Sequence, residues 1–209
     1  MPPSDPRFFT EEWIITLPSH PKLRFIPMTP TPANFDSWAK ICTNPLNHPF
    51  DNNKHEVWDE EKLKETKDRI RQRFIDAKTK HHVLELLVKL DRESVGCGGV
   101  FELEHQPHIA NIGLMIEESA RIRGVGKALM EVLLRLSNDF EVEIIEADTM
   151  KVNKPMRALA ASLGVDETDE IKEVPGRGVV AEILYKNIAR EKWKDLDMKV
   201  EFTGPVPEY

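Results

Sequence analysis

Cysteine is scarce in this 209-residue chain, which contains only Cys42 and Cys97. Neither cysteine belongs to a CxxC pair or has histidine neighbours at metal-ligand spacing. We therefore expect reduced thiols, with neither a disulfide framework nor a metal site.

Long apolar runs are also missing. No stretch approaches the roughly 18 consecutive apolar residues that a membrane-spanning helix needs. The first residues, MPPSDPRFFTEEW, lack the basic-then-apolar order of a secretory signal. We expect a cytoplasmic protein, with the nucleus as an alternative, that has no membrane partner.

An excess of basic residues is the third absence, because 36 acidic residues outnumber 29 basic ones and the net charge is -7. Such a surface does not attract phosphate backbones, so we expect no nucleic-acid partner. The hydrophobic fraction of 40% is that of a globular protein, and the length fits one domain. Prolines cluster near both ends, which favours arms, turns and strand edges there.

Apolar periodicity predicts an α/β fold, a mixed central sheet with helices on both faces. Strands are expected at 23–28, 83–90, 95–103, 109–116, 142–147, 171–174 and 179–185, and helices at 32–41, 59–77, 127–136 and 153–163. Within this pattern, the turn from the strand 109–116 into the helix 127–136 is the most informative segment.

The loop Arg121–Lys127 precedes that helix directly and contains Gly124 and Gly126. Glycines there let consecutive amides point at an anion, supported by the positive end of the helix. The spacing matches neither a P-loop nor a dinucleotide-binding fingerprint, since Ala128 follows Lys127 and Leu129 stands at the third glycine position. The loop therefore predicts a diphosphate site of another kind.

The motif R-I-R-G-V-G, which follows the strand end Leu114-Met115-Ile116, resembles the coenzyme A loop of the GNAT N-acetyltransferases. The helix that follows Asn153, with Met156, Leu159 and Gly164-Val165, is similar to a second motif of that family. The segment R-F-I-P-M and the ending I-A-R-E-K-W resemble its ribosomal-protein-modifying branch. The resemblance covers roughly residues 22–193 and implies the GNAT fold, in which the fourth and fifth strands splay apart. It thus implies an N-terminal arm over 1–21, an acetyltransferase domain over 22–193 and a C-terminal tail over 194–209.

The same resemblance implies acetyl-CoA as co-substrate, without a metal. Its predicted ligands are Met115, Ile116, Arg121, Ile122, Arg123, Gly124, Val125, Gly126, Lys127 and Asn153. The acceptor would lie near His48, Phe50 and Trp58. The implied activity is direct transfer of acetyl to a primary amine in a ternary complex, with a small molecule favoured over a protein N-terminus or lysine, by a monomer or a homodimer. A coenzyme A-binding sensor or scaffold with weak catalysis is the alternative.

Proton transfer is the least defined part of the prediction. Candidate bases are Glu102, Glu104, His105, His108, Glu146 and Asp148, of which Glu102 and His108 rank first. The position where the family often carries a carboxylate falls on Ala110 and Asn111. The usual acid positions hold Met156 and Ala160, which have no acidic proton, so we expect catalysis without a general acid.

Overall fold

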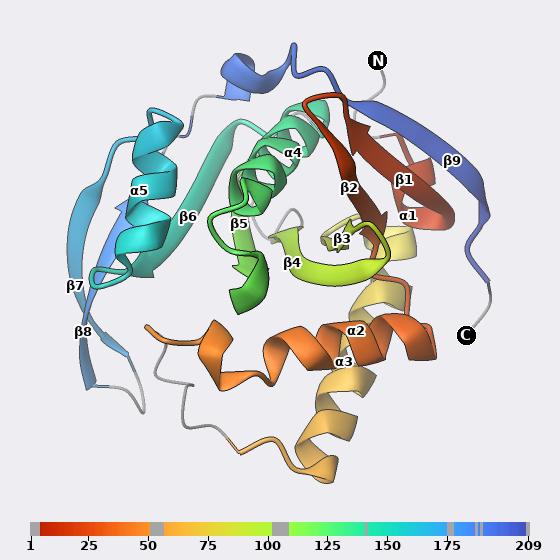
Figure 1. Ribbon diagram of the computed structural model, residues 1–209, viewed down its shortest axis with the longest axis horizontal. Helices are drawn as coiled ribbons and strands as arrows, with labels where there is room; N and C mark the ends of the chain where they lie inside the picture. Colours follow the sequence, from red (N-terminus) through yellow and green to blue (C-terminus); the bar gives the residue numbers. More distant parts are fainter. Residues whose placement is uncertain are drawn as a thin grey trace.

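A nine-stranded sheet forms the centre of the computed structural model, which describes residues 5–50, 57–101, 109–140, 142–174, 178–186, 188 and 190–207. The strand order is β7-β8-β6-β5-β4-β3-β2-β1-β9, and each neighbouring pair is antiparallel except β5 and β6, which are parallel (Figure 1). The strands are β1 (Glu11–Leu17), β2 (His20–Pro27), β3 (Leu84–Leu90), β4 (Glu93–Phe101), β5 (Ile109–Ile116), β6 (Ile144–Met150), β7 (Thr168–Val174), β8 (Gly178–Tyr185) and β9 (Lys199–Pro205). The mixed α/β fold predicted from the sequence is confirmed.

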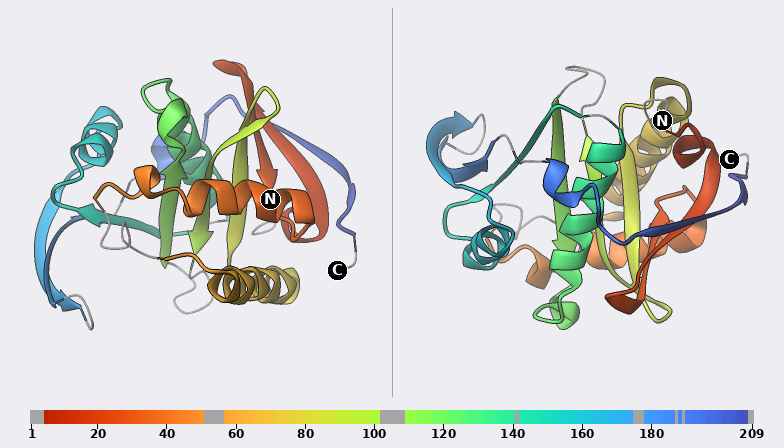
Figure 2. Two further views of the ribbon diagram at one scale, coloured as in Figure 1. Left: turned by 60° about the horizontal axis from the view of Figure 1, so that its bottom comes forward. Right: turned by 90° about the horizontal axis from the view of Figure 1, so that it is seen from above.

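Helices cover both faces of the sheet, as Figure 2 shows. α4 packs on β4 and β5 from one side, whereas α2 contacts the same two strands from the other. Neighbouring residues of β3 reflect this arrangement, because Leu86 belongs to the α4 side of the core and Leu87 packs with Phe35 and Ile70. The helical segments are α1 (Arg7–Thr10), α2 (Pro32–Cys42), α3 (Glu60–Lys80), α4 (Val125–Asp139), α5 (Lys154–Ser162), η1 (Pro45–Asn47), η3 (Glu118–Ala120) and η4 (Arg190–Trp193).

The two proline-rich ends are built into the sheet. The first strand is β1, not the expected strand at 23–28, and β9 pairs with β1 at the edge of the sheet. Trp13, Ile15 and Leu17 alternate along β1 and are buried, which is the period of a half-buried strand. The segments expected to be an arm and a tail therefore each supply a strand, because these apolar positions gain more by packing than the flanking prolines cost.

The parallel pair β5 and β6 separates part of the way along its length. The pairing covers Ile109 with Ile144, Ala110 with Ile145, and Asn111 with Glu146, and it ends there although both strands continue. β6 leans away from β5 in Figure 1. The expected splay is confirmed; because β1 precedes the expected first strand, the family's fourth and fifth strands are β5 and β6.

No helix in the described part of the chain is both long enough and apolar enough to span a bilayer.

Candidate active site

The loop before α4 has the backbone of an anion site. Ile122 has φ 64° and Gly124 has φ 78°, so two left-handed residues alternate with Arg123 between them. Such alternation turns successive amides toward one side. Gly124 is the N-cap of α4 and no side chain caps the helix, so the amides of the first turn remain available to a ligand.

Gly126 leaves room at the same place. A Cβ atom at this position would lie 3.6 Å from Cγ1 of Ile116 and 3.8 Å from Cδ2 of Leu159, which are ordinary packing distances. The fold alone would therefore accept a side chain there. That the position holds glycine is consistent with the prediction that a diphosphate approaches bare backbone here.

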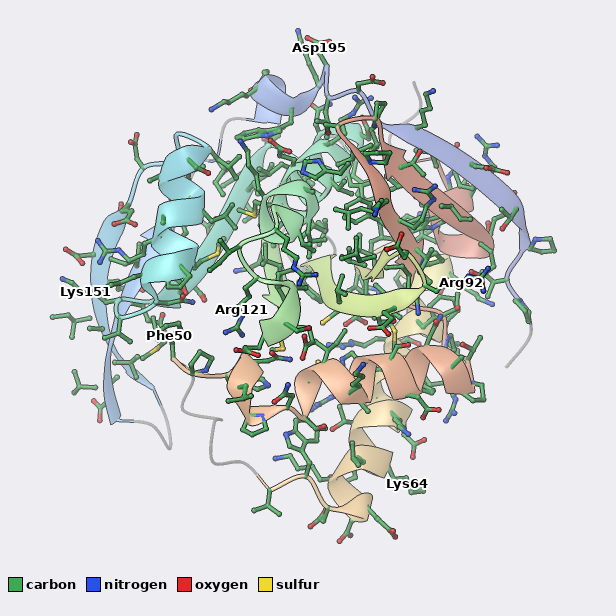
Figure 3. The ribbon with its side chains drawn as sticks, in the orientation of Figure 1. Phe50, Lys64, Arg92, Arg121, Lys151 and Asp195 are labelled. Atoms are coloured by element: carbon green, nitrogen blue, oxygen red, sulfur yellow. The ribbon has the colours of Figure 1, made fainter. Side chains whose placement is uncertain are left out.

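Basic side chains surround this loop. Arg123 and Lys127 are exposed, and Nε of Arg121 donates to the carbonyl oxygen of Ile116 at 3.3 Å. Figure 3 shows Arg121 beside the open end of the splay. His20, from the start of β2, also reaches the loop, because its Nε2 lies 3.2 Å from where a Cβ of Gly124 would stand. Sequence reasoning missed His20, since only the tertiary fold brings it to Gly124.

Beyond Asn111, the edge of β5 that faces β6 has no strand partner among the described residues. The opposite edge pairs with β4, where Met115 stands across from Cys97 and Ile116 from Gly96. An unpaired strand edge can bind an extended ligand through its backbone groups. This is the geometry that a pantetheine arm needs along the predicted ligands Met115 and Ile116.

Asn153 is the N-cap of α5. Its Oδ1 accepts from the amide of Met156 at 3.2 Å, and its Nδ2 donates to Oγ1 of Thr149 at 2.9 Å. Both side-chain atoms thus hold the start of α5 to the end of β6. A contact between Asn153 and the pantetheine arm remains a prediction.

The segment that follows α2, which includes η1 and which we call the covering segment, is bonded to the residues that follow β5. Oδ1 of Asn47 accepts from the amide of Glu118 at 2.7 Å, and Nδ2 of Asn47 donates to the carbonyl of Ile41 at 2.8 Å. Asn44 donates to the carboxylate of Glu117 at 3.3 Å. The buried Asn47 thus holds η1 against the end of β5. The predicted acceptor residues His48 and Phe50 pointed to this region, but nothing in the sequence singled out Asn47.

The pKa of Glu117 is held below its usual range by the hydroxyl of Ser119, with a smaller contribution from Asn44. This carboxylate is therefore committed to the turn that precedes the loop and is already bonded before a substrate arrives.

The three predicted acceptor residues occupy different places. Nε2 of His48 donates to the carbonyl of Cys42 at 2.7 Å, at the end of α2. Phe50 lies toward β6 and α5 in Figure 3. The segment after η1 runs toward the same two elements in Figures 1 and 2. Trp58 packs edge-on against Trp38 with ring centroids 5.9 Å apart, on the side of α3. His48 and Phe50 therefore belong to the covering segment, whereas Trp58 packs against α2.

The predicted bases Glu102 and His108, with Glu104 and His105, lie outside the described residues. Two possible acids are described, and both are engaged elsewhere. Ser162 donates to the carbonyl of Leu159 at 2.7 Å, and the hydroxyl of Tyr185 donates to Oε1 of Glu167 at 3.3 Å. Burial raises the pKa of Tyr185 to about 12.

Comparisons with known proteins agree with this geometry. The family model described as the acetyltransferase (GNAT) family matches residues 46–165. A search of curated proteins found no match.

Among solved structures, the chain is similar to RimL, a ribosomal alpha-N-protein acetyltransferase in complex with coenzyme A. The sequence identity is 14% and the TM-score 0.63, and the match covers 84% of this chain and 97% of RimL. It is similar to Mycobacterium smegmatis RimJ in complex with CoA-disulfide at 18% identity and a TM-score of 0.62, covering 86% and 88%. A chimera of the spermidine N-acetyltransferase SpeG from Vibrio cholerae and hSSAT matches at 14% identity and a TM-score of 0.59, covering 83% and 99%. At such identities the likeness shows a shared fold.

Proposed function

The chain belongs to the acetyltransferase (GNAT) family, and we propose that it transfers the acetyl group of acetyl-CoA to the primary amine of a small molecule. The observation that carries this proposal is the position of the uncapped start of α4 at the open end of the splay between β5 and β6. One end of this space suits a diphosphate, and its strand edge suits an extended arm that ends in a thioester.

Direct attack by the amine is the reaction this arrangement favours. The amine nitrogen would bond to the thioester carbon, and a backbone amide of β5 near Met115 or Ile116 would stabilise the oxyanion that forms. The thiolate then leaves when the carbon–sulfur bond breaks, and the nitrogen gives its extra proton to the thiolate or to solvent. Since a thiol has a pKa near 8.5, this leaving group needs little help from an acid.

A small acceptor is supported by the covering segment and by charge. Asn44 and Asn47 hold this segment to the residues that follow β5, so the acceptor side is partly closed. The net charge of -7 also favours an amine, which is a cation before it reacts. The second candidate is a protein N-terminus or lysine side chain, and the similarity to RimL, an alpha-N-protein acetyltransferase, supports the N-terminus. The acid positions held by Met156 and Ala160 support the third, a coenzyme A-binding protein with weak turnover.

Release of free thiol from acetyl-CoA separates these functions. The protein would be incubated with polyamines, arylalkylamines and short peptides that carry either a free N-terminus or a lysine. We expect thiol release with at least one small amine and weaker release with peptides. Release with peptides alone would support the second candidate, and tight binding of acetyl-CoA without release would support the third.

A further inference from the structure

Glu146 stands at the closed tip of the splay. It pairs with Asn111 in the last registered pair of β5 and β6, beyond which the strands separate. Paired residues on neighbouring strands lie about 4.8 Å apart and point to the same face of the sheet. A carboxylate is therefore placed where the reactive end of a ligand lying along β5 would meet β6.

The side chain of Glu146 points to the acceptor side. Ala110 and Ile145, one residue earlier on each strand, are fully buried in the core that includes α4. Because side chains alternate along a strand, Asn111 and Glu146 face the opposite side, where α2 and η1 lie. This is the face from which the covering segment encloses an acceptor.

The carboxylate of Glu146 is not engaged by any residue in the described part of the chain. The residue is partly exposed, and its carboxylate makes no hydrogen bond or ion pair with the residues that the structure describes. Two other acidic residues near the splay that the structure describes are engaged. Glu117 bonds Ser119 and Asn44, and Asp148, farther along β6, is more exposed and has an interaction of its own.

We propose that Glu146 is the general base of the transfer, an inference that rests on the proposed function. A primary amine has a pKa near 10 and reaches the site as an ammonium ion. Its proton passes to the carboxylate of Glu146, directly or through one water, and the neutral nitrogen then forms the new bond to carbon. The carbon–sulfur bond breaks and coenzyme A leaves as thiolate. The nitrogen, now part of the amide, loses its second proton to that thiolate or to solvent, and Glu146 returns its own proton to solvent.

The test compares two probe amines of similar size. Phenethylamine is protonated at neutral pH, whereas the weakly basic nitrogen of O-benzylhydroxylamine is neutral there and needs no base before attack. We expect Glu146→Gln to lower kcat/KM for phenethylamine by about 10²–10⁴-fold. The loss with O-benzylhydroxylamine should be at least about tenfold smaller, with the Kd of acetyl-CoA unchanged within about twofold.

Two further variants make the result specific. Glu146→Asp keeps a carboxylate and should recover part of the lost rate. Glu170→Gln removes a charge from β7 and should leave kcat unchanged. Equal losses with both amines would indicate a structural role and overturn the proposal, as would full activity of Glu146→Gln or the selective loss appearing in Asp148→Asn. Wild-type protein that binds acetyl-CoA yet acetylates no amine of the panel described above would count against the proposed transfer itself, whereas equal losses with both probe amines count against the base alone.

Discussion

Gly126 offers the sharpest test of the coenzyme A site, because two substitutions there should separate stability from binding. Gly126→Ala adds a Cβ at 3.6 Å from Ile116 and 3.8 Å from Leu159, where it packs without displacing either. Alanine also loses less backbone entropy in a helix, which stabilises by about 0.5–1 kcal/mol. For a protein of this size the melting temperature should rise by about 1–4 °C.

Gly126→Val places two methyl groups about 1.5 Å beyond the Cβ, in the space where a diphosphate must approach the amides of α4. A hydrogen bond to a charged group contributes about 1.5–3 kcal/mol, so losing one or two of them costs about 3 kcal/mol of binding free energy. The Kd of acetyl-CoA should therefore rise about 100-fold. The alanine variant, whose side chain stops at the Cβ, should bind within about threefold of wild type.

Isothermal titration calorimetry measures both affinities, and circular dichroism checks that the variants are folded. Gly98→Ala provides a control in which the stability falls. A Cβ at this position would lie 2.8 Å from the carbonyl oxygen of Gly113 and must destabilise the sheet. Wild-type affinity in a folded Gly126→Val protein would refute the placement of the diphosphate at this loop. A large stability loss in Gly126→Ala would refute the packing argument.

Three other outcomes follow from the described contacts. Asn47→Ala removes both side-chain hydrogen bonds of Asn47 and leaves only the weaker tie through Asn44, so the KM of the acceptor should rise about tenfold with little change in the Kd of acetyl-CoA. Steady-state kinetics would show this, and an unchanged KM would contradict it. Ser162→Ala and Tyr185→Phe should retain most turnover because both hydroxyls bond elsewhere, and loss of turnover at unchanged melting temperature would identify an acid. Arg73→Met breaks a 2.7 Å ion pair with Glu85, a carboxyl whose pKa is raised by burial, and should cost about 2 kcal/mol near neutral pH. The loss of unfolding free energy should become smaller as the pH falls through the raised pKa of Glu85, because the neutral carboxyl tolerates burial without its partner. Urea unfolding of both proteins at about pH 7.5 and about pH 5 measures this loss, and an equal loss at both pH values would contradict the reasoning.

The sequence alone determined the order of the core elements and the position of the anion loop, because both depend on interactions between residues that are close in the chain. The periodicity of α4 and the glycines at Gly124 and Gly126 are properties of adjacent residues, so they can be read without knowing the fold. Asn153 was likewise identifiable as an N-cap from its place before a helix. These features depend on interactions within a few residues, which a sequence displays directly.

Tertiary structure alone decided which distant residues meet. It added β1 and β9 to the sheet, brought His20 to Gly124, and buried Asn47 against the residues that follow β5. It also ended the pairing of β5 and β6 at Glu146, which sequence reasoning had ranked below Glu102 and His108. Strand register and the point where two strands part depend on packing across the whole sheet. No local sequence pattern encodes that packing. The position of the Glu146 carboxylate relative to the splay is therefore determined only by the folded chain.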